Sequence, residues 1–359
     1  MPSICVHLRS FADNPLLRGL STAARAIGLY RIRQVLAACL AVLTLTAPLS
    51  AQAEPTAPAA TIRLAVLKYG TANWLLDVIG RHKLDQAEGV TLAIKEYAGT
   101  QATLVALQAG DTDLAIDDWV WVARQRTEGR PFTFVPYSTA TGALVVPQGS
   151  DIRGIADLKG RPLGIAGGAL DKNWLLLRAL AARQGIDLAG AVQPVYGAPP
   201  LISEQLKQGR VAAAVTYWHY AARLAAAGYS PVVQIKSVIK DLGVDAAVPM
   251  IGFCFNETWA TGQRQALQGF FRAADRARTL LRDSDAEWEA LRPLMAAPDE
   301  ATFIALRDGF RAGIPSQWGP AERAGAEQLF QVLRAVGGSQ LVGDATTLPA
   351  GTFWDGATD

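Results

Sequence analysis

The stretch Leu107-Gln108-Ala109-Gly110-Asp111-Thr112-Asp113-Leu114-Ala115-Ile116-Asp117-Asp118-Trp119-Val120-Trp121 recurs 99 residues later as Leu206-Lys207-Gln208-Gly209-Arg210-Val211-Ala212-Ala213-Ala214-Val215-Thr216-Tyr217-Trp218-His219-Tyr220. Leucine, glycine, alanine and tryptophan coincide in the two copies, and Ile116 matches Val215. A second match lies upstream at an offset of 100, where Asn73-Trp74-Leu75-Leu76 corresponds to Asn173-Trp174-Leu175-Leu176. A unit of this size that occurs only twice predicts two similar α/β lobes rather than a solenoid.

Apolar runs and helical spacings predict the same order of elements in both halves. The first half has expected strands at 62–67, 90–97 and 114–116, and expected helices at 73–79, 101–108 and 119–126. The second half has expected strands at 163–166, 192–196, 212–216 and 232–235, and expected helices at 171–184, 201–208 and from Trp218 onward. Strands at 132–137 and 142–146 should carry the chain into the second lobe, and 249–256 should return it. Residues 257–336 have a helical pattern and are expected to cover lobe one.

The N-terminal segment has the pattern of a secretory signal. Arg31 and Arg33 precede an apolar run from Val35 to Thr46, and Ala51-Gln52-Ala53 forms a small-residue cleavage site. We expect cleavage before Glu54 and export of a soluble protein to the periplasm, with a lipid anchor at Cys39 as the alternative. The expected organisation is a signal peptide at 1–53, a disordered mature N-terminus at 54–60, lobe one at 61–142 and 248–340, lobe two at 143–247, and a mobile C-terminal tail at 341–359.

Composition excludes several classes of function. The net charge is +2 and no basic block is present, which argues against nucleic-acid binding. Of three cysteines only Cys254 follows the signal, so no intrachain disulfide is expected. His82 and His219 are far apart, and a histidine-based metal site is not expected. We expect no cofactor.

The paired carboxylates Asp117-Asp118, followed by Trp119, are the strongest chemical signal. Adjacent carboxylates repel unless they are solvated, cap a helix or face a cation. One of them is expected to cap the next helix, and the other to project at the carboxyl end of the strand, where open α/β sheets bind ligands. Tyr217-Trp218-His219-Tyr220 is the matching position in lobe two, and at least one of these four aromatic rings should line the cleft.

Other polar and aromatic side chains at the predicted strand ends complete a candidate binding site. Each also has a structural explanation, because tryptophans often anchor helices in the core and hydroxyls often lie in solvated turns. The expected ligand-binding residues are Asn73, Trp74, Thr100, Gln101, Asp117, Asp118, Trp119, Ser138, Thr139, Asp171, Asn173, Trp174, Tyr217, Trp218 and His219. No motif of a serine hydrolase, a P-loop or a zinc protease is present, so no catalytic residue is expected.

The ordered motifs 107–115, Ile155-Ala156-Asp157-Leu158-Lys159-Gly160 and 205–215 resemble the substrate-binding proteins of ABC importers of the nitrate/sulfonate/taurine class, relatives of the pyrimidine-precursor (thiamine biosynthesis) binding proteins. The resemblance spans about 65–255. It implies a type II periplasmic-binding-protein fold, in which each lobe is a mixed, mostly parallel sheet flanked by helices. It also implies hinged closure on one small molecule and delivery to an ABC permease with its ATPase. We expect the chain to be a monomer.

The mixture of acidic and aromatic residues favours an amine-bearing, zwitterionic or heteroaromatic organic ligand. A taurine, alkanesulfonate or nitrate receptor of the same class is the alternative. A periplasmic enzyme and a sensor on the same fold are the other two classes of function, and we expect the chain not to be an enzyme.

Overall fold

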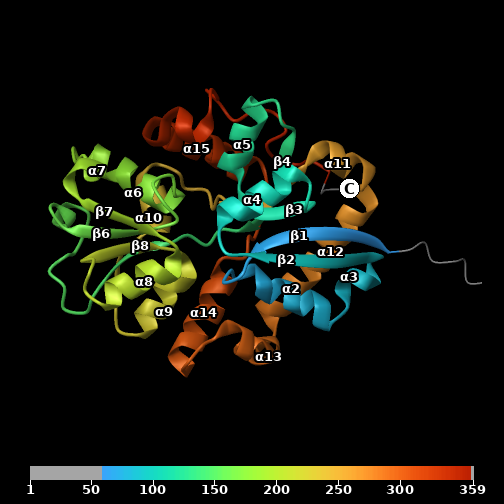
Figure 1. Ribbon diagram of the computed structural model, residues 1–359, viewed down its shortest axis with the longest axis horizontal. Coiled ribbons are helices and arrows are strands. Elements are labelled where there is room, and N and C mark those ends of the chain that lie inside the picture. The colour runs from blue at the N-terminus through green and yellow to red at the C-terminus, as the bar shows by residue number, and fades with distance from the viewer. Residues whose placement is uncertain (1–58, 357–359) are drawn as a thin grey trace, which may run out of the picture. The chain divides into compact units, whose positions relative to one another are not determined.

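The computed structural model describes residues 59–356, so the expected signal at 1–53 and residues 54–58 of the expected disordered N-terminus lie outside the described residues. Two five-stranded sheets organise the described chain (Figure 1). The first has the strand order β2-β1-β3-β10-β4 and the second β7-β6-β8-β5-β9. We call the first sheet with its helices lobe one, and the second sheet with its helices lobe two.

Lobe one uses both ends of the described chain. Its first segment comprises β1 (Ala60–Leu67), α2 (Ala72–Arg81), α3 (Leu84–Ala87), β2 (Val90–Tyr97), α4 (Thr100–Ala109), β3 (Leu114–Asp118), α5 (Trp119–Thr127) and β4 (Phe132–Ser138). Its second segment comprises β10 (Ile251–Asn256), α11 (Glu257–Gly262), α12 (Arg264–Asp283), α13 (Asp285–Met295), α14 (Glu300–Ala312) and α15 (Pro320–Val342).

Lobe two is the central part of the chain. It comprises β5 (Ala143–Val146), the 3₁₀ helix η1 (Ala156–Leu158), β6 (Pro162–Ala166), α6 (Lys172–Arg183), α7 (Leu188–Ala191), β7 (Gln193–Gly197), α8 (Pro199–Lys207), β8 (Ala213–Thr216), α9 (Trp218–Ala226), β9 (Ser230–Gln234) and α10 (Ile235–Asp241). The chain crosses between the sheets at 139–142 and again between α10 and β10.

The two sheets have the same pattern of strand directions. β1 pairs in parallel with β2 and β3, and β6 pairs in parallel with β7 and β8. β10 runs antiparallel to β3 and β4, and β5 runs antiparallel to β8 and β9. Each sheet is therefore mixed and mostly parallel, and the carboxyl ends of its parallel strands meet at one edge.

Side-chain alternation along the strands builds a core on both faces of each sheet. In β1, Ile62, Leu64 and Val66 join one apolar cluster with α2, α12, α13 and α14, whereas Ala65 joins another with α5 and α15. In lobe two, α6 and α10 cover one face of the sheet and α8 and α9 cover the other. Strands buried on both faces read as continuous apolar runs, which is why such runs in the sequence located them.

Two features of the C-terminal region differ from expectation. Helix α15 does not cover lobe one alone, because it packs against α5 of lobe one and α6 of lobe two. The expected tail is not detached in its described part. Phe353 is 9% exposed and pairs with Phe134 of β4, and Trp354 packs against Phe255 and Phe271. Among residues 59–356, no helix combines the length and the apolar composition that a bilayer span requires.

Candidate functional site

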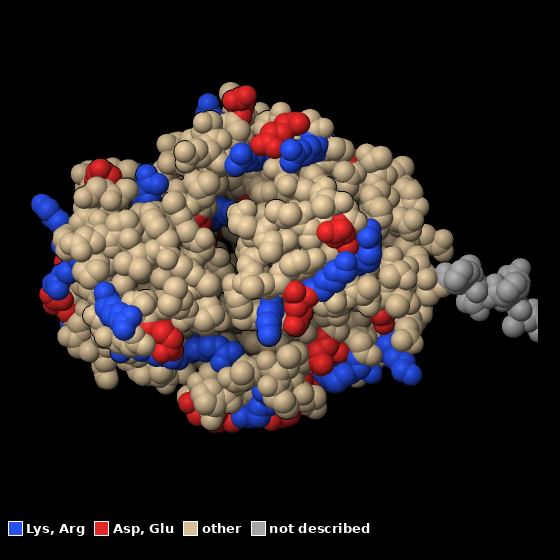
Figure 2. Space-filling view, viewed as in Figure 1, with Lys and Arg blue, Asp and Glu red and all other residues tan. Residues whose placement is uncertain are grey.

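A cavity of about 440 Å³ lies where the carboxyl ends of strands from both sheets meet. The strand ends Leu67 and Asp118 of lobe one line it, together with Gly167 and Tyr217, which follow β6 and β8 of lobe two. Figure 2 shows a hollow between the lobes, surrounded by a mostly uncharged face. This is the position at which α/β sheets bind ligands, because strand-to-helix turns present polar groups there.

Asp118 is the capping carboxylate of the acidic pair, and it also joins the lobes. Its Oδ1 accepts a hydrogen bond from the backbone N–H of Trp121 at 3.0 Å, which satisfies one free donor at the start of α5. Its Oδ2 forms an ion pair with Nζ of Lys172, the first residue of α6 in lobe two. Both oxygens of this 2%-exposed residue therefore have protein partners.

Asp171 has the equivalent capping role in lobe two. Its Oδ1 accepts hydrogen bonds from the backbone N–H groups of Asn173 and Trp174, at 2.9 and 3.2 Å. Burial raises the pKa of Asp171 to about 6, although Lys172 and the capping donors act in the opposite direction. The backbone N–H groups of Asn173 and Trp174 at the start of α6 are thus occupied by a carboxylate of the chain itself.

Asp117 has a different environment from its neighbour. It is 7% exposed and lines the cavity, and among the ion pairs of the described residues none involves it. Burial and the adjacent Asp118 hold its pKa well above the usual range, against the opposing effect of Lys172. Burial by itself lowers the pKa of Lys172, but Asp118 and Asp117 outweigh it and the pKa is raised. Lys172 is therefore charged and Asp117 lacks a cation of its own.

Two aromatic side chains in the cavity wall have polar atoms without partners. The hydroxyl of Tyr137 and both ring nitrogens of His219 are buried and make no hydrogen bond. Burial lowers the pKa of His219 to about 3, so its ring is neutral. Buried polar atoms in native proteins usually have partners, so unpaired ones in a cavity wall indicate a missing hydrogen-bonding group.

The side chain of Trp218, which belongs to lobe two, packs into the core of lobe one. Its ring lies 6.1 Å from that of Trp74, edge to face, and against Gly309 of α14. A Cβ atom at Gly309 would lie 2.7 Å from the indole, so only glycine permits this approach. Arg223 of α9 adds hydrogen bonds to the carbonyls of Met295 and Ala296 at the end of α13. These contacts and the Lys172–Asp118 ion pair hold the two lobes together.

The structure brings ten of the fifteen expected site residues to the cavity wall: Thr100, Gln101, Asp117, Asp118, Ser138, Asp171, Asn173, Tyr217, Trp218 and His219.

The other five lie outside the cavity wall, each for a packing or hydrogen-bonding reason. Trp119 and Trp174 are core residues at 0% and 1% exposure, and Trp74 packs in the core of lobe one. Asn73 lies inside α2 rather than capping it, and its side chain bonds to the carbonyls of Leu67 and Lys68. Thr139 donates its hydroxyl to the carbonyl of Gly313.

Sequence reasoning missed Lys172, Tyr137, Leu170 and Ile251 as cavity residues. Lys172 had a usable signal, because it directly follows a helix-capping Asp at a strand end. Tyr137 and Ile251 had none, since each lies in an apolar strand and only the pairing of β10 with β4 brings them together.

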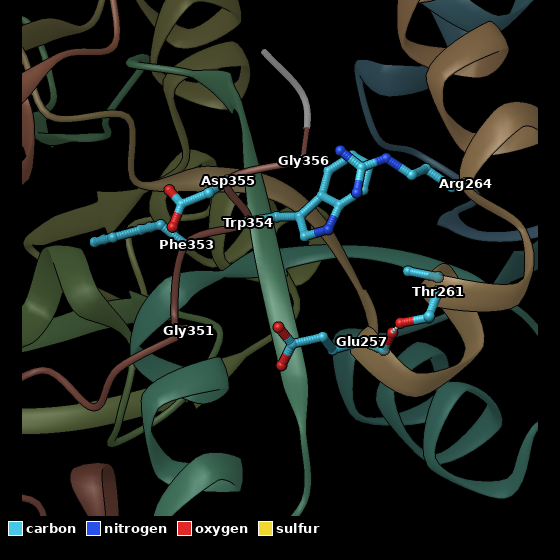
Figure 3. A pocket seen from close by; sticks show the side chains of 9 residues that line it. Glu257, Thr261, Arg264, Gly351, Phe353, Trp354, Asp355 and Gly356 are labelled. Atoms are coloured by element: carbon cyan, nitrogen blue, oxygen red, sulfur yellow. Dashed lines mark hydrogen bonds between the residues drawn. The ribbon is translucent and has the colours of Figure 1, made fainter. Parts of the chain in front are cut away.

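A second cavity, of about 270 Å³, lies between α11 and the C-terminal segment. Figure 3 shows its lining, to which α11 contributes Glu257 and Thr261 and the C-terminal segment contributes Trp354 and Asp355. It shares no residue with the cavity between the lobes. Within residues 59–356, no group of three or more His, Cys, Asp or Glu side chains is placed to hold a metal ion.

Comparison with known proteins finds one family model and many solved structures. The model described as NMT1/THI5 like matches residues 86–285, more than half of the 359-residue chain. No curated protein sequence matches this chain.

Three solved structures illustrate the structural likeness. The alkanesulfonate-binding protein SsuA from Xanthomonas axonopodis pv. citri, bound to MOPS, is 19% identical, with a TM-score of 0.65 over 82% of this chain and 98% of that chain. The periplasmic aliphatic sulphonate binding protein SsuA from Escherichia coli is 17% identical, with a TM-score of 0.65 over 82% and 92%. The desulfurization enzyme DszB is 17% identical, with a TM-score of 0.54 over 82% and 97%. At these identities the likeness establishes a two-lobed periplasmic-binding-protein fold.

Proposed function

Because this chain belongs to the NMT1/THI5-like family, we propose that it is the solute-binding component of an ABC importer. It captures a small organic molecule between its lobes and delivers it to a membrane permease driven by an ATPase. The family match confirms the resemblance predicted from the motifs at 107–115, 155–160 and 205–215. The solved relatives named as sulfonate-binding proteins share the fold and support the same class of function.

The observation that carries this proposal is the cavity between the lobes. Strand ends from both sheets line it, and an ion pair and an aromatic contact connect its two sides. A ligand held in such a place contacts both lobes, so its binding favours the conformation in which they touch. We place the hinge at the crossings 139–142 and 242–250, so that lobe two comprises 143–241 rather than the expected 143–247.

We propose that the ligand leaves chemically unchanged. DszB shows that an enzyme occurs on this fold, so the fold alone does not decide between binding and catalysis. In this chain the carboxylates Asp118 and Asp171 cap helices, and Lys172 is paired. Burial raises the pKa of the Cys254 thiol well above its usual range, which disfavours the reactive thiolate. These residues are arranged to shape and hold a site.

We propose that the mature protein is a monomer that starts at Glu54 in the periplasm. Intact mass of protein exported from a bacterial host tests the cleavage site, and an acyl adduct on Cys39 would contradict it.

Native mass spectrometry of that exported protein tests the binding function. We expect a co-purifying small molecule, and we expect small-angle scattering to show a more compact protein when that molecule saturates it. If no small molecule co-purifies and the radius of gyration is the same after purified candidate solutes are added, the receptor function is wrong.

A further inference from the structure

We infer that Asp117 is the ligand's counter-charge, so that the ligand of this cleft carries a protonated nitrogen and a bare sulfonate is not accepted. This inference rests on the proposed receptor function and deepens it. It assigns different roles to two adjacent carboxylates, because Asp118 joins the lobes and Asp117 meets the ligand.

The first step is the charge inventory of the cavity. Among the described residues that line it, Asp117, Asp118 and Asp171 are acidic and Lys172 is the basic one, while His219 is neutral. Asp118 already pairs with Lys172. A sulfonate would therefore enter a site with an excess of carboxylates and without an unpaired cation, and both charge repulsion and lost hydration oppose that.

The second step is the state of the helix ends beside the ion pair. The capping residues Asp118 and Asp171 of α5 and α6 line the cavity, and their side chains accept hydrogen bonds from free N–H groups in the first turns of these helices. At these two ends the capping carboxylates repel a further anion. The starts of α2 and α4 have no side-chain cap and line the other part of the cavity with Thr71, Ala72, Thr100 and Gln101. A zwitterion can place its anionic group there, provided that its ammonium group satisfies Asp117.

The third step is the unmet hydrogen-bonding capacity in the wall. Asp117 is 7% exposed, and Tyr137 and His219, at 5% and 7%, have polar atoms without partners. Burial without a paired cation favours the protonated form of Asp117, and an ammonium group or a protonated heterocycle displaces that proton to solvent and pairs with the resulting carboxylate. Tyr137 and His219 can then take the remaining polar atoms of the ligand.

The test uses two pairs of probes that differ in their charged group. 2-Aminoethanesulfonate is compared with ethanesulfonate, and benzylammonium with phenylmethanesulfonate, by calorimetric titration of the full mature chain freed of co-purified molecules. We expect the ammonium-bearing member of each pair to bind at least tenfold more tightly, which is about 1.4 kcal/mol. In Asp117→Asn this preference should disappear.

The matched control is Asp344→Asn, which makes the same charge change at an exposed site outside the cavity and outside both crossings. Its affinities should stay within twofold of the wild type. Asp117→Asn should fold, because the amide has nearly the same shape as the carboxyl group and cannot ionise beside Asp118. A melting temperature equal to or above that of the wild type checks this.

Three results would overturn the inference: tighter binding of the bare sulfonates, unchanged ammonium binding in Asp117→Asn, or no binding of either ammonium probe. Sulfonate binding that is abolished in Lys172→Met would reassign recognition to Lys172 and leave the receptor function intact. The receptor function itself fails only on its own test, when no small molecule co-purifies and none makes the protein more compact.

Discussion

The charged and polar residues of the cleft form two groups, according to whether other residues of the chain supply their hydrogen-bond or ion-pair partners. Asp118 and Asp171 have partners at helix ends, and Lys172 has one across the cleft. His219 and Asp117 are equally buried, but the ring nitrogens of His219 have no hydrogen-bond partner, and no ion pair of the described residues involves Asp117. Groups that have such partners stabilise the fold. A buried group without one carries a free-energy cost that a bound ligand can remove by pairing with it.

His219 should make the protein sensitive to acid. Its pKa is about 3 in the folded chain and about 6.5 when unfolded, so the unfolded state binds more protons between these values. Stability is therefore fully present above about pH 6.5 and falls as the pH drops, by about 2 kcal/mol at pH 5. We expect His219→Phe to lose correspondingly less stability than the wild type between pH 7.5 and pH 5, measured by urea unfolding.

Asp171 provides an internal reference for that experiment. Its folded pKa is raised, so its effect on stability has the opposite sign and falls in the window from about 3.8 to about 6. The wild type and His219→Phe both retain Asp171, so its effect cancels when the stability loss of one protein is subtracted from that of the other. Parallel stability curves for wild type and variant would mean that the imidazole is hydrated in solution.

At the scale of elements, α9 and α14 form the principal helix contact between the lobes. Trp218 starts α9 and lies against Gly309 in α14, and Arg223 bonds to the end of α13. Close packing of this kind does not tolerate added volume, because neighbouring side chains and backbone must shift. The contact therefore determines how closely the lobes approach.

Gly309→Ala should favour the open arrangement of the lobes. The new methyl group would lie 2.7 Å from the indole of Trp218, so the helices must separate. We expect a larger radius of gyration by small-angle scattering and a red shift of tryptophan emission. The control is Gly80→Ala in α2, where no atom lies within 4 Å of the added Cβ. That variant should keep the wild-type radius and gain about 0.5–1 kcal/mol of stability from helix propensity. An unchanged radius in Gly309→Ala would show that α14 moves freely.

At the scale of the whole molecule, α15 makes the lobes one cooperative unit. Ala326, Leu329, Phe330 and Leu333 belong to an apolar cluster that continues from α5 of lobe one to α6 of lobe two. Lobes that share a core should not unfold separately, whereas lobes joined by two crossings alone would.

Calorimetry should therefore record a single unfolding transition for the mature chain, with equal calorimetric and van't Hoff enthalpies. Phe330→Ala, at a fully buried position of α15, should lower the free energy of unfolding by about 3–5 kcal/mol. Val105→Ala, at an exposed position of α4, should change it little. Two separate transitions in the wild type would show that α15 does not couple the lobes.

The sequence by itself determined the two lobes, the order of their elements and the location of the cleft. The repeat of 107–121 at 206–220 falls on β3–α5 and β8–α9, where strand and helix periodicities differ clearly. Local rules also predicted that one member of Asp117-Asp118 caps a helix, because capping depends only on neighbours in the chain. The same rules could not separate Trp119 and Trp174, which are core residues, from Trp218, which reaches the cleft.

Only the tertiary structure determined which charged and polar groups have hydrogen-bond or ion-pair partners. Lys172 and Asp118 are 54 residues apart in the chain, and they pair because Asp118 ends β3 and Lys172 starts the helix that follows β6 in the other sheet. The packing of α15 across both lobes and of Phe353 against Phe134 likewise depends on volumes and distances between distant segments. The periodicity of apolar residues shows which face of a helix or strand is buried, but not which other segment packs against that face. That is why the acidic pair was visible in the sequence, and why the separate roles of its two members were not.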